Sequence, residues 1–447
     1  MRIVVLGAGY AGLTLARRLE DALGPDHELI VINDSPSHLV QHEIHRAIRR
    51  PAIAESVVVP LTKVLDRATV RVAQVESVDP DAKTVSLAAP PSAERAARAY
   101  DGDGGAGEGD DSDSDGGRAE SEGTTIEIEN GGERADSAEN AGDSGEGRER
   151  TGEGGESEST LAYDVCAICL GAETDFQDVP GVAEHATPLK RLPDAERIRA
   201  DFLSVLPEGG RVVVCGAGLS GIQVAGELAV LARERGASED IEVLLTEALG
   251  EVAPAFSTEF SRAVREELED RGVEIRTNAP VERADSGGVV IDDEEITADQ
   301  LLWTGGIRGS RALGNERPVV KSTLELEEGT FVVGDAARVV DTNGAAVPAS
   351  AQSAVREARA VAESIATIAD QEDADGFRPR LAPFDFDSPG WLVSVGDGAV
   401  AQVGPTVLRG KAAKALKTSV GAGYLTSVGA IGDAVDLARE ELASGPD

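Results

Sequence analysis

Short apolar runs alternate along the chain with longer segments whose apolar positions recur every three or four residues. The first run, residues 2–6, breaks into glycines, a helical pattern follows over 13–19, and a second apolar run covers 28–34. The same order returns between residues 211 and 246. Strands that alternate with helices predict parallel sheets covered by helices, so we expect an α/β fold with two similar units.

The rest of the chain contains further elements of both kinds. Alternating apolar residues over 70–78 and 83–87, separated by Asp79-Pro80-Asp81, predict a β-hairpin. We expect other strands within 161–172, 273–296, 301–303, 331–333 and 391–403, and other helices over 190–202, 259–271 and 349–368. After residue 403 the pattern predicts a helical tail.

Residues 92–160 break this pattern, because Gly, Asp, Glu and Ser dominate there. Such a segment cannot bury enough apolar area to offset the entropy of ordering it, so we expect a disordered insertion. An acidic segment that binds a partner is the alternative interpretation.

The first strand leads into Gly7-Ala8-Gly9-Tyr10-Ala11-Gly12, a Gly-x-Gly-x-x-Gly motif between a strand and a helix. In that context Gly7 permits a tight turn, Gly9 admits a pyrophosphate and Gly12 lets helix and strand pack closely. The second strand ends at Asn33 and Asp34, where a side chain usually binds the ribose. We favour Asp34, because a carboxylate accepts two hydroxyl hydrogen bonds without a competing donor. Because the first strand begins at residue 2, we expect no signal peptide ahead of it.

The motif recurs as Gly216-Ala217-Gly218-Leu219-Ser220-Gly221. Its second strand ends at Glu247, and a carboxylate there binds the ribose 2′-hydroxyl and repels a 2′-phosphate, which favours NADH over NADPH. Two dinucleotide sites on one chain predict a flavin and a nicotinamide. Two later strands end in glycines, at Gly305 and at Gly334-Asp335, and Asp335 is expected to head a helix and reach the flavin's ribityl chain.

The net charge of −39 bears on the salt concentration at which the protein works and on whether it binds nucleic acid. Residues 101–160 hold 20 acidic residues and four arginines, so most of the acidity lies in the remaining chain. We interpret it as an adaptation to high salt, which screens the self-repulsion, and we expect no nucleic-acid partner. Three cysteines, and no apolar stretch long enough to span a membrane, predict a cytoplasmic protein without disulfides.

Two constellations invite a metal or redox interpretation. His38, His42 and His45 would share one face of a helix, which raises the alternative of a zinc site, although packing beside the cofactor is favoured. Cys166 and Cys169 have the spacing of a redox pair, but residues three apart on a strand point to opposite faces. We therefore expect two buried structural thiols and no metal.

The C-terminal tail carries the cations Arg409, Lys411, Lys414 and Lys417 in an otherwise acidic chain. Apolar residues interleave with them at roughly helical spacing: Leu408, Leu416, Val420, Tyr424, Leu425 and Val428. Cations beside an apolar face are typical of a helix that lies on a membrane surface, so residues 408–428 are a candidate for peripheral membrane contact. Packing against the rest of the chain, or against the partner in a homodimer, is the alternative.

The order of these motifs resembles the FAD-dependent pyridine nucleotide oxidoreductases, and among them the type II NADH dehydrogenases. The resemblance covers roughly residues 1–90 and 161–430, and includes the strand that ends in Leu170-Gly171-Ala172 and the segment Val347-Pro348-Ala349-Ser350-Ala351-Gln352. It implies hydride transfer from NADH to FAD, then two-electron transfer to a membrane-dissolved quinone near Ala351 and Gln352, without proton pumping. Two positions depart from the family: Gln223 stands where Glu is usual, and Arg356 where Gln is usual.

The resemblance also implies the domain plan. Residues 1–190 and 301–372 form the FAD-binding domain, 191–300 the NAD-binding domain and 373–447 a small α+β unit for an interface or a membrane. Gln223, Ala351 and Gln352 are the candidate catalytic residues. The candidate cofactor-binding residues are Gly7, Gly9, Tyr10, Ala11, Gly12, Asn33, Asp34, Val75, Gly171, Gly216, Gly218, Gly221, Glu247, Gly305, Gly334 and Asp335.

Three alternative functions remain at this point. A sulfide:quinone oxidoreductase would need a reactive cysteine. An NAD(P)H-dependent reductase of a soluble electron carrier would not need the C-terminal tail at a membrane. A flavin-binding sensor would show no turnover. We expect a cytoplasmic enzyme, with the inner face of the cell membrane as its site of attachment if the tail binds lipid.

Overall fold

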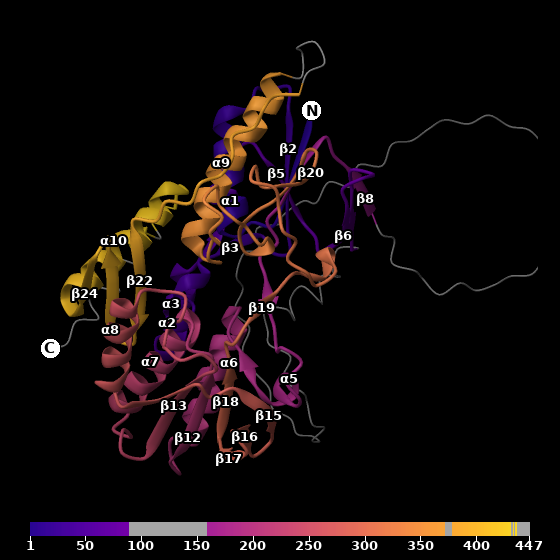
Figure 1. The fold of residues 1–447 in the computed structure, drawn as a ribbon. Coiled ribbons are helices and arrows are strands. Elements are labelled where there is room, and N and C mark those ends of the chain that lie inside the picture. The colour runs from indigo at the N-terminus through magenta and orange to yellow at the C-terminus, as the bar shows by residue number, and fades with distance from the viewer. Residues whose placement is uncertain (89–158, 372–377, 431, 433, 436–447) are drawn as a thin grey trace, which may run out of the picture. The chain divides into compact units, whose positions relative to one another are not determined.

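The computed structural model describes residues 1–88, 159–371, 378–430, 432, 434 and 435 (Figure 1). Most of the predicted insertion lies outside these residues. The description resumes at Ser159, two residues inside the predicted insertion, where strand β8 (Ser159–Ala162) begins. β8 is antiparallel to β7 (Thr84–Leu87), with Leu87 opposite Ser159.

The first predicted unit forms a six-stranded sheet in the order β20-β21-β9-β1-β2-β5. Five of the strands are parallel, and β20 is antiparallel at the edge. The strands are β1 (Arg2–Leu6), β2 (Glu28–Asn33), β5 (Thr69–Val72), β9 (Val165–Ile168), β20 (Glu325–Glu327) and β21 (Thr330–Val332). Helices α1 (Tyr10–Ala22) and α9 (Ala351–Asp370) pack against each other beside this sheet. Continuous apolar runs fit this arrangement, because a covered parallel sheet buries both faces of its central strands.

The second unit forms a five-stranded parallel sheet in the order β11-β18-β12-β13-β14. Its strands are β11 (Thr187–Pro188), β12 (Gly210–Cys215), β13 (Ile241–Glu247), β14 (Val273–Thr277) and β18 (Gln300–Trp303). The associated helices are α6 (Leu192–Val205), α7 (Leu219–Glu234) and α8 (Thr258–Glu269). The described residues therefore confirm the predicted α/β class and its two similar halves.

Smaller elements connect these sheets. Strands β6 (Val75–Asp79), β7 and β8 form one antiparallel sheet, and β15 (Val281–Asp285), β16 (Gly288–Ile291) and β17 (Glu294–Thr297) form another. Two-stranded sheets pair β3 (Ser37–Leu39) with β4 (Val58–Pro60), and β10 (Glu173–Thr174) with β19 (Ile307–Arg308). The short helices are α2 (His45–Arg49), α3 (Ile53–Ser56) and α5 (Val182–His185).

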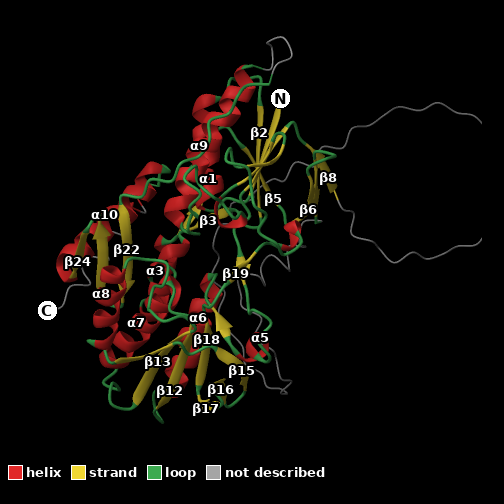
Figure 2. Cartoon of the chain, viewed as in Figure 1, coloured by secondary structure: helices red, strands yellow, loops and turns green. Residues whose placement is uncertain are grey.

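The C-terminal unit contains the antiparallel strands β22 (Gly390–Val395), β23 (Gly398–Val403) and β24 (Thr406–Arg409). Helix α10 (Gly410–Ser427) follows directly and packs on β23 (Figure 2). The predicted strands and helical tail are confirmed, although Leu408 and Arg409 lie in β24 and not in the helix. Among the described residues, no helix is both long and apolar enough to span a membrane.

One local prediction holds only in part, and two are wrong. The hairpin pairs only β6 with β7, because residues 69–72 form β5 and join the large parallel sheet. The three histidines do not share a helix face, because His38 lies on β3, His42 in a 3-10 turn and His45 at the start of α2. Asp335 does not head a long helix: Gly334–Ala336 is a single 3-10 turn, and α9 begins at Ala351.

Candidate functional site

The first glycine loop is shaped to bind an anion at the start of α1. Gly7 has a φ of +91°, and a Cβ there would lie 2.4 Å from the carbonyl oxygen of Cys169. A Cβ on Gly12 would lie 1.8 Å from the carbonyl oxygen of Gly7, so helix and loop touch without side chains. At Gly9 the space is open, with no atom within 4 Å of a Cβ, and no side chain caps the helix. Free N–H groups at an open helix start suit a phosphate group.

The second loop repeats this geometry at the start of α7. Gly216 has a φ of +99°, and a Cβ there would lie 2.8 Å from the Cα of Gly305, so the candidate residue Gly305 packs directly against this loop. A Cβ on Gly221 would lie 1.9 Å from the carbonyl oxygen of Gly216, whereas Gly218 faces open space. The chain therefore contains two uncapped, open helix starts that suit two dinucleotides.

The strand ends beside the two loops differ in their polar groups. Asn33 accepts a hydrogen bond from the Ala8 N–H (2.8 Å) and donates to Ser35 and Ser37. Asp34, which we favoured for the ribose, is half-exposed and pairs with Arg191 at 3.2 Å. The Asn33 amide thus ties the glycine loop to the next turn, whereas the Asp34 carboxylate is accessible.

Glu247 is buried at the second strand end. One carboxylate oxygen accepts from the Ala217 N–H (2.8 Å) and the other from the Leu249 N–H (2.9 Å). Two backbone donors fix this negative charge beside the glycine loop, where the sequence predicts the ribose of NADH.

Around Gly334 and Asp335 the fold gathers charged groups that the sequence analysis missed. The Gly334 N–H donates to the buried Glu357 carboxylate (2.6 Å), and Arg317 donates to the carbonyl oxygen of Asp335 (2.7 Å). Burial raises the pKa of Glu357 to about 7, and burial also raises the pKa of Asp335 against the opposing effect of Lys190 and Arg317. No local motif marks these residues, because they come from three separate segments.

An aromatic cluster holds α10 against the first glycine loop. Neutral His38 donates through Nδ1 to the carbonyl oxygen of Ala8 (2.8 Å), because a carbonyl can only accept. Its Nε2 then accepts from the Tyr424 hydroxyl (3.1 Å), and the Tyr424 and Tyr10 rings lie 4.8 Å apart. Burial lowers the pKa of His38 to about 4, so it is neutral near pH 7. Tyr10 also hydrogen-bonds His42. The favoured interpretation of His38 and His42, packing beside the cofactor loop, agrees with these contacts.

One cation of the tail is used inside the protein. Lys417 is buried and pairs with Glu43 at 3.4 Å, and Glu43 also accepts from Arg46 at 3.0 Å. Burial alone would raise the pKa of Glu43, but Lys417, His42 and Arg46 hold it well below its usual range. Leu425 and Val428 are buried as well, so much of the tail's apolar face packs inside the chain.

The candidate catalytic residues lie near the starts of two helices. Ala351 and Gln352 open α9, where Gln352 donates to the Ser388 hydroxyl at 3.1 Å, and both are half-buried. Gln223 is half-buried on the second turn of α7.

Two candidate cofactor-binding residues lie on or after strands of the first unit. Val75 begins β6 and is buried, whereas Gly171 follows β9 with a φ of +68° and open space around it.

The cysteines are buried and free. Burial raises the pKa of Cys166 and Cys169 well above the usual range and that of Cys215 to about 12, so all three are thiols at neutral pH. Buried neutral thiols are poor nucleophiles, which disfavours the cysteine chemistry of a sulfide:quinone oxidoreductase. Within the described ranges no group of three or more His, Cys, Asp or Glu side chains could hold a metal ion.

Comparison with known proteins extends this picture to the whole chain. The family described as pyridine nucleotide-disulphide oxidoreductase matches residues 1–358. The type II NADH:quinone oxidoreductase of Staphylococcus haemolyticus is 23% identical over 465 residues, which cover 96% of each chain.

Solved structures show the same fold at lower identity. NDH2 from Plasmodium falciparum, in complex with NADH, superposes with a TM-score of 0.72 at 13% identity, covering 98% of this chain and 97% of the other. The sulfide:quinone oxidoreductase from Aquifex aeolicus superposes with a TM-score of 0.68 at 18% identity, covering 96% and 92%.

Proposed function

Because the chain belongs to the pyridine nucleotide-disulphide oxidoreductase family, we propose that it is an NADH:quinone oxidoreductase that uses FAD. In the overall reaction NADH, a proton and a quinone give NAD⁺ and a quinol. The observation that carries the proposal is the pair of open, uncapped glycine loops at the starts of α1 and α7. The full-length similarity to a protein named type II NADH:quinone oxidoreductase supports the choice of donor and acceptor.

The residues of the first unit fit FAD. Gly9 leaves room for a pyrophosphate at the start of α1, and Asp34 offers a carboxylate for the ribose. Asp335 is partly buried on the 3-10 turn that we assign to the ribityl chain. When bound, FAD supplies the two-electron chemistry, and the protein binds and orients it.

The second unit is the proposed NADH site. Glu247 is a fixed carboxylate that suits a ribose 2′-hydroxyl and repels a 2′-phosphate. Gln223, on the second turn of α7, is proposed to meet the nicotinamide end. Aligning donor and acceptor is the protein's main contribution, since proximity and orientation alone can lower a barrier by about 7–11 kcal/mol.

We place the quinone beside Ala351 and Gln352, and propose that the chain reaches membrane-dissolved quinone through the outward face of α10. The exposed described residues of that helix carry no charge, which is unusual in a chain of net charge −39: Gly410, Ala412, Ala415, Ser419, Val420, Gly423, Thr426 and Ser427. Sedimentation with vesicles of anionic lipid, together with light scattering, separates membrane contact at the inner face of the cell membrane from a homodimer.

The acidity supports a further proposal, that the protein works in high salt. The surplus of acidic residues persists in the described part of the chain, so it belongs to the folded surface. Salt screens repulsion among such charges, with a Debye length of about 3 Å at 1 M.

Anaerobic mixing with NADH in high salt tests the proposed reaction. We expect NADH to bleach the flavin absorption rapidly and a quinone to restore it. Bleaching by sulfide or NADPH but not by NADH would point instead to a sulfide:quinone oxidoreductase or an NADPH-dependent reductase. A protein that binds no added FAD would contradict the proposal at its first motif.

A further inference from the structure

Helix α7, which begins at the second glycine loop, is held from two sides by other parts of the chain. On one side α2 of the first unit packs against it, and on the other the hairpin between β22 and β23 does. The α7 residues in these contacts include Gly226, Glu227, Arg233 and Glu234, and the first of them lies one turn after Gln223.

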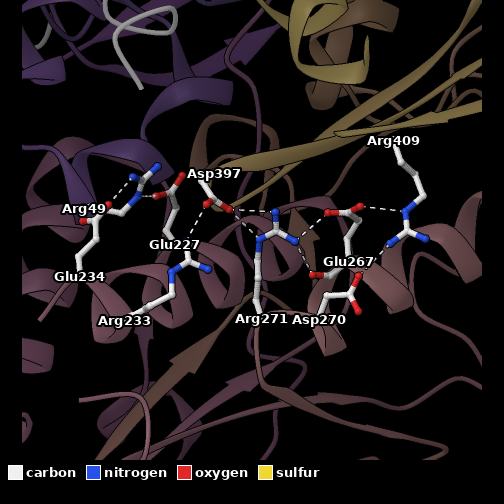
Figure 3. Close-up of polar contacts among 9 residues, drawn as sticks. All are labelled: Arg49, Glu227, Arg233, Glu234, Glu267, Asp270, Arg271, Asp397 and Arg409. Atoms are coloured by element: carbon white, nitrogen blue, oxygen red, sulfur yellow. Dashed lines mark hydrogen bonds and ion pairs between the residues drawn. The ribbon is translucent and has the colours of Figure 1, made fainter. Parts of the chain in front are cut away.

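The contact with α2 is a buried ion pair. Arg49 donates to Glu227 at 2.5 Å and to Glu234 at 2.9 Å (Figure 3). The Arg49 and Glu227 side chains are 5% and 1% exposed, and the second oxygen of Glu227 has no hydrogen-bond partner. A buried charge that loses its partner costs about 3–5 kcal/mol, so this pair strongly resists separation of the two helices.

Glu227 lies four residues after Gln223, so the two side chains share one face of α7, one turn apart. The first unit therefore holds α7 next to the residue assigned to the nicotinamide. Arg199 of α6 reinforces the same junction, because it donates to the carbonyl oxygens of Ile48 (2.7 Å) and Arg49 (3.0 Å).

The contact with the hairpin depends on glycines and a bridging carboxylate. A Cβ on Gly226 would lie 2.5 Å from the backbone nitrogen of Gly396, so the two backbones touch. The neighbouring Asp397 accepts from Arg233 of α7 (2.6 Å) and from Arg271, which follows α8 (2.9 Å). Figure 3 shows the chain of ion pairs continuing through Glu267 to Arg409.

We propose that Arg49, Glu227 and Asp397 are positioning residues that fix α7 and so set the alignment for hydride transfer. Arg49 and Glu227 hold α7 against the FAD-binding domain, and Asp397 holds it against the hairpin of the C-terminal unit. The inference rests on the proposed NADH oxidation. None of the three side chains needs to touch NADH or FAD, because they act through the backbone of α7 and through Gln223. A misplacement of about 1 Å can cost about a hundredfold in rate, so small shifts of α7 should be measurable.

The test compares Asp397→Asn with a matched control, Glu242→Gln. Asp397 is only 27% exposed at its side chain but lies on a surface turn, so its loss should leave the fold intact. Glu242 makes a similar 2.7 Å pair with Arg211, but within the NAD-binding sheet and at the strand ends away from the glycine loop. Glu227→Gln is the second variant, because its amide oxygen can still accept from Arg49 while the charge is lost.

Each holoenzyme is mixed anaerobically with increasing NADH, and the flavin absorption is followed. For Asp397→Asn and Glu227→Gln we expect the flavin reduction rate at saturating NADH to fall about tenfold. The NADH concentration for half-maximal rate and the FAD content should stay within twofold, and deuteration of the NADH C4 hydride should give a larger isotope effect than in wild type. Glu242→Gln should match wild type throughout.

Two results would overturn the inference. One is a reduction rate within twofold of wild type in both variants; the other is a rate that falls only in parallel with FAD content or NADH affinity, which would indicate general damage. If the wild-type flavin itself is not bleached by NADH, the proposed function fails first, and the inference fails with it.

Discussion

Asn33 and Glu247 occupy equivalent positions in the two halves of the chain. Each ends the second strand of its unit, and each side chain accepts a 2.8 Å hydrogen bond from the N–H of the alanine between the first two glycines. The hydrogen bond is the same but the charge is not. Asn33 is neutral and its amide donors are used within the next turn, whereas Glu247 places a carboxylate at the corresponding point.

This difference predicts that Glu247 controls the choice between NADH and NADPH. Glu247→Gln keeps an acceptor for one backbone N–H but removes the charge that repels a 2′-phosphate. We expect the ratio of kcat/KM for NADH over NADPH to fall by about tenfold or more, the scale of a charged hydrogen bond. Steady-state rates with both nucleotides measure it, and Glu251→Gln, an exposed carboxylate nearby, is the control. An unchanged ratio would contradict the assignment.

The link between α10 and the first glycine loop predicts an effect on FAD retention. Tyr424→Phe keeps the ring against Tyr10 but removes the hydroxyl that donates to His38. Loss of one neutral hydrogen bond, worth about 0.5–1.5 kcal/mol, should weaken FAD binding by about two- to tenfold. Fluorescence of released FAD after dilution measures it. Ser427→Ala, which removes a hydroxyl bonded only within α10, should retain FAD like wild type.

Glu357 predicts a specific dependence of stability on pH. Its pKa is about 7 in the folded chain because of burial, against 4.5 as the ordinary value. Between those values the folded state keeps a proton that the unfolded state has lost, so the free energy of unfolding decreases as pH rises through this interval. The full difference is about 3 kcal/mol.

The variant Glu357→Gln should lack this decrease. Chemical unfolding at pH 5 and pH 8 should therefore show the variant gaining stability relative to wild type at the higher pH. Equal differences at both values would indicate that Glu357 does not titrate in this range.

The acidic surface predicts that salt stabilises the fold. Raising KCl from 0.1 to 2 M should increase Tm by about 5 °C, because screening relieves repulsion in the folded state. A variant without residues 93–156 should show a similar increase, since most of the acidic residues lie elsewhere. If only the full chain responds, the effect comes from the insertion and not from the folded surface.

Features encoded over short distances could be predicted from the sequence. The two glycine loops, their flanking strands and helices, and Glu247 at a strand end follow from local pattern and spacing. The hairpin limits were missed because residues 69–72 have the same alternation whether they pair within a hairpin or join a parallel sheet. Only the packing of the whole chain determines that these residues pair with β2 in the parallel sheet.

The groups around the site could not be predicted, because they are assembled from distant segments. Lys190, Arg317 and Glu357 meet near Asp335 only after folding, and Lys417 is neutralised by Glu43 from the opposite end of the chain. The basic tail illustrates the reason: a pattern of cations and apolar residues is the same whether it faces lipid or a buried carboxylate.

Because Leu87 pairs with Ser159, the fold does not depend on the length of the acidic segment between them. Its two ends are neighbours in one antiparallel sheet, so a turn of a few residues could close the same strands. Since the entropy of closing a loop grows only with the logarithm of its length, that replacement should gain about 2–3 kcal/mol at most. Evolution could therefore lengthen or shorten this connection at little cost, and a foreign domain grafted there should leave the rest of the enzyme intact.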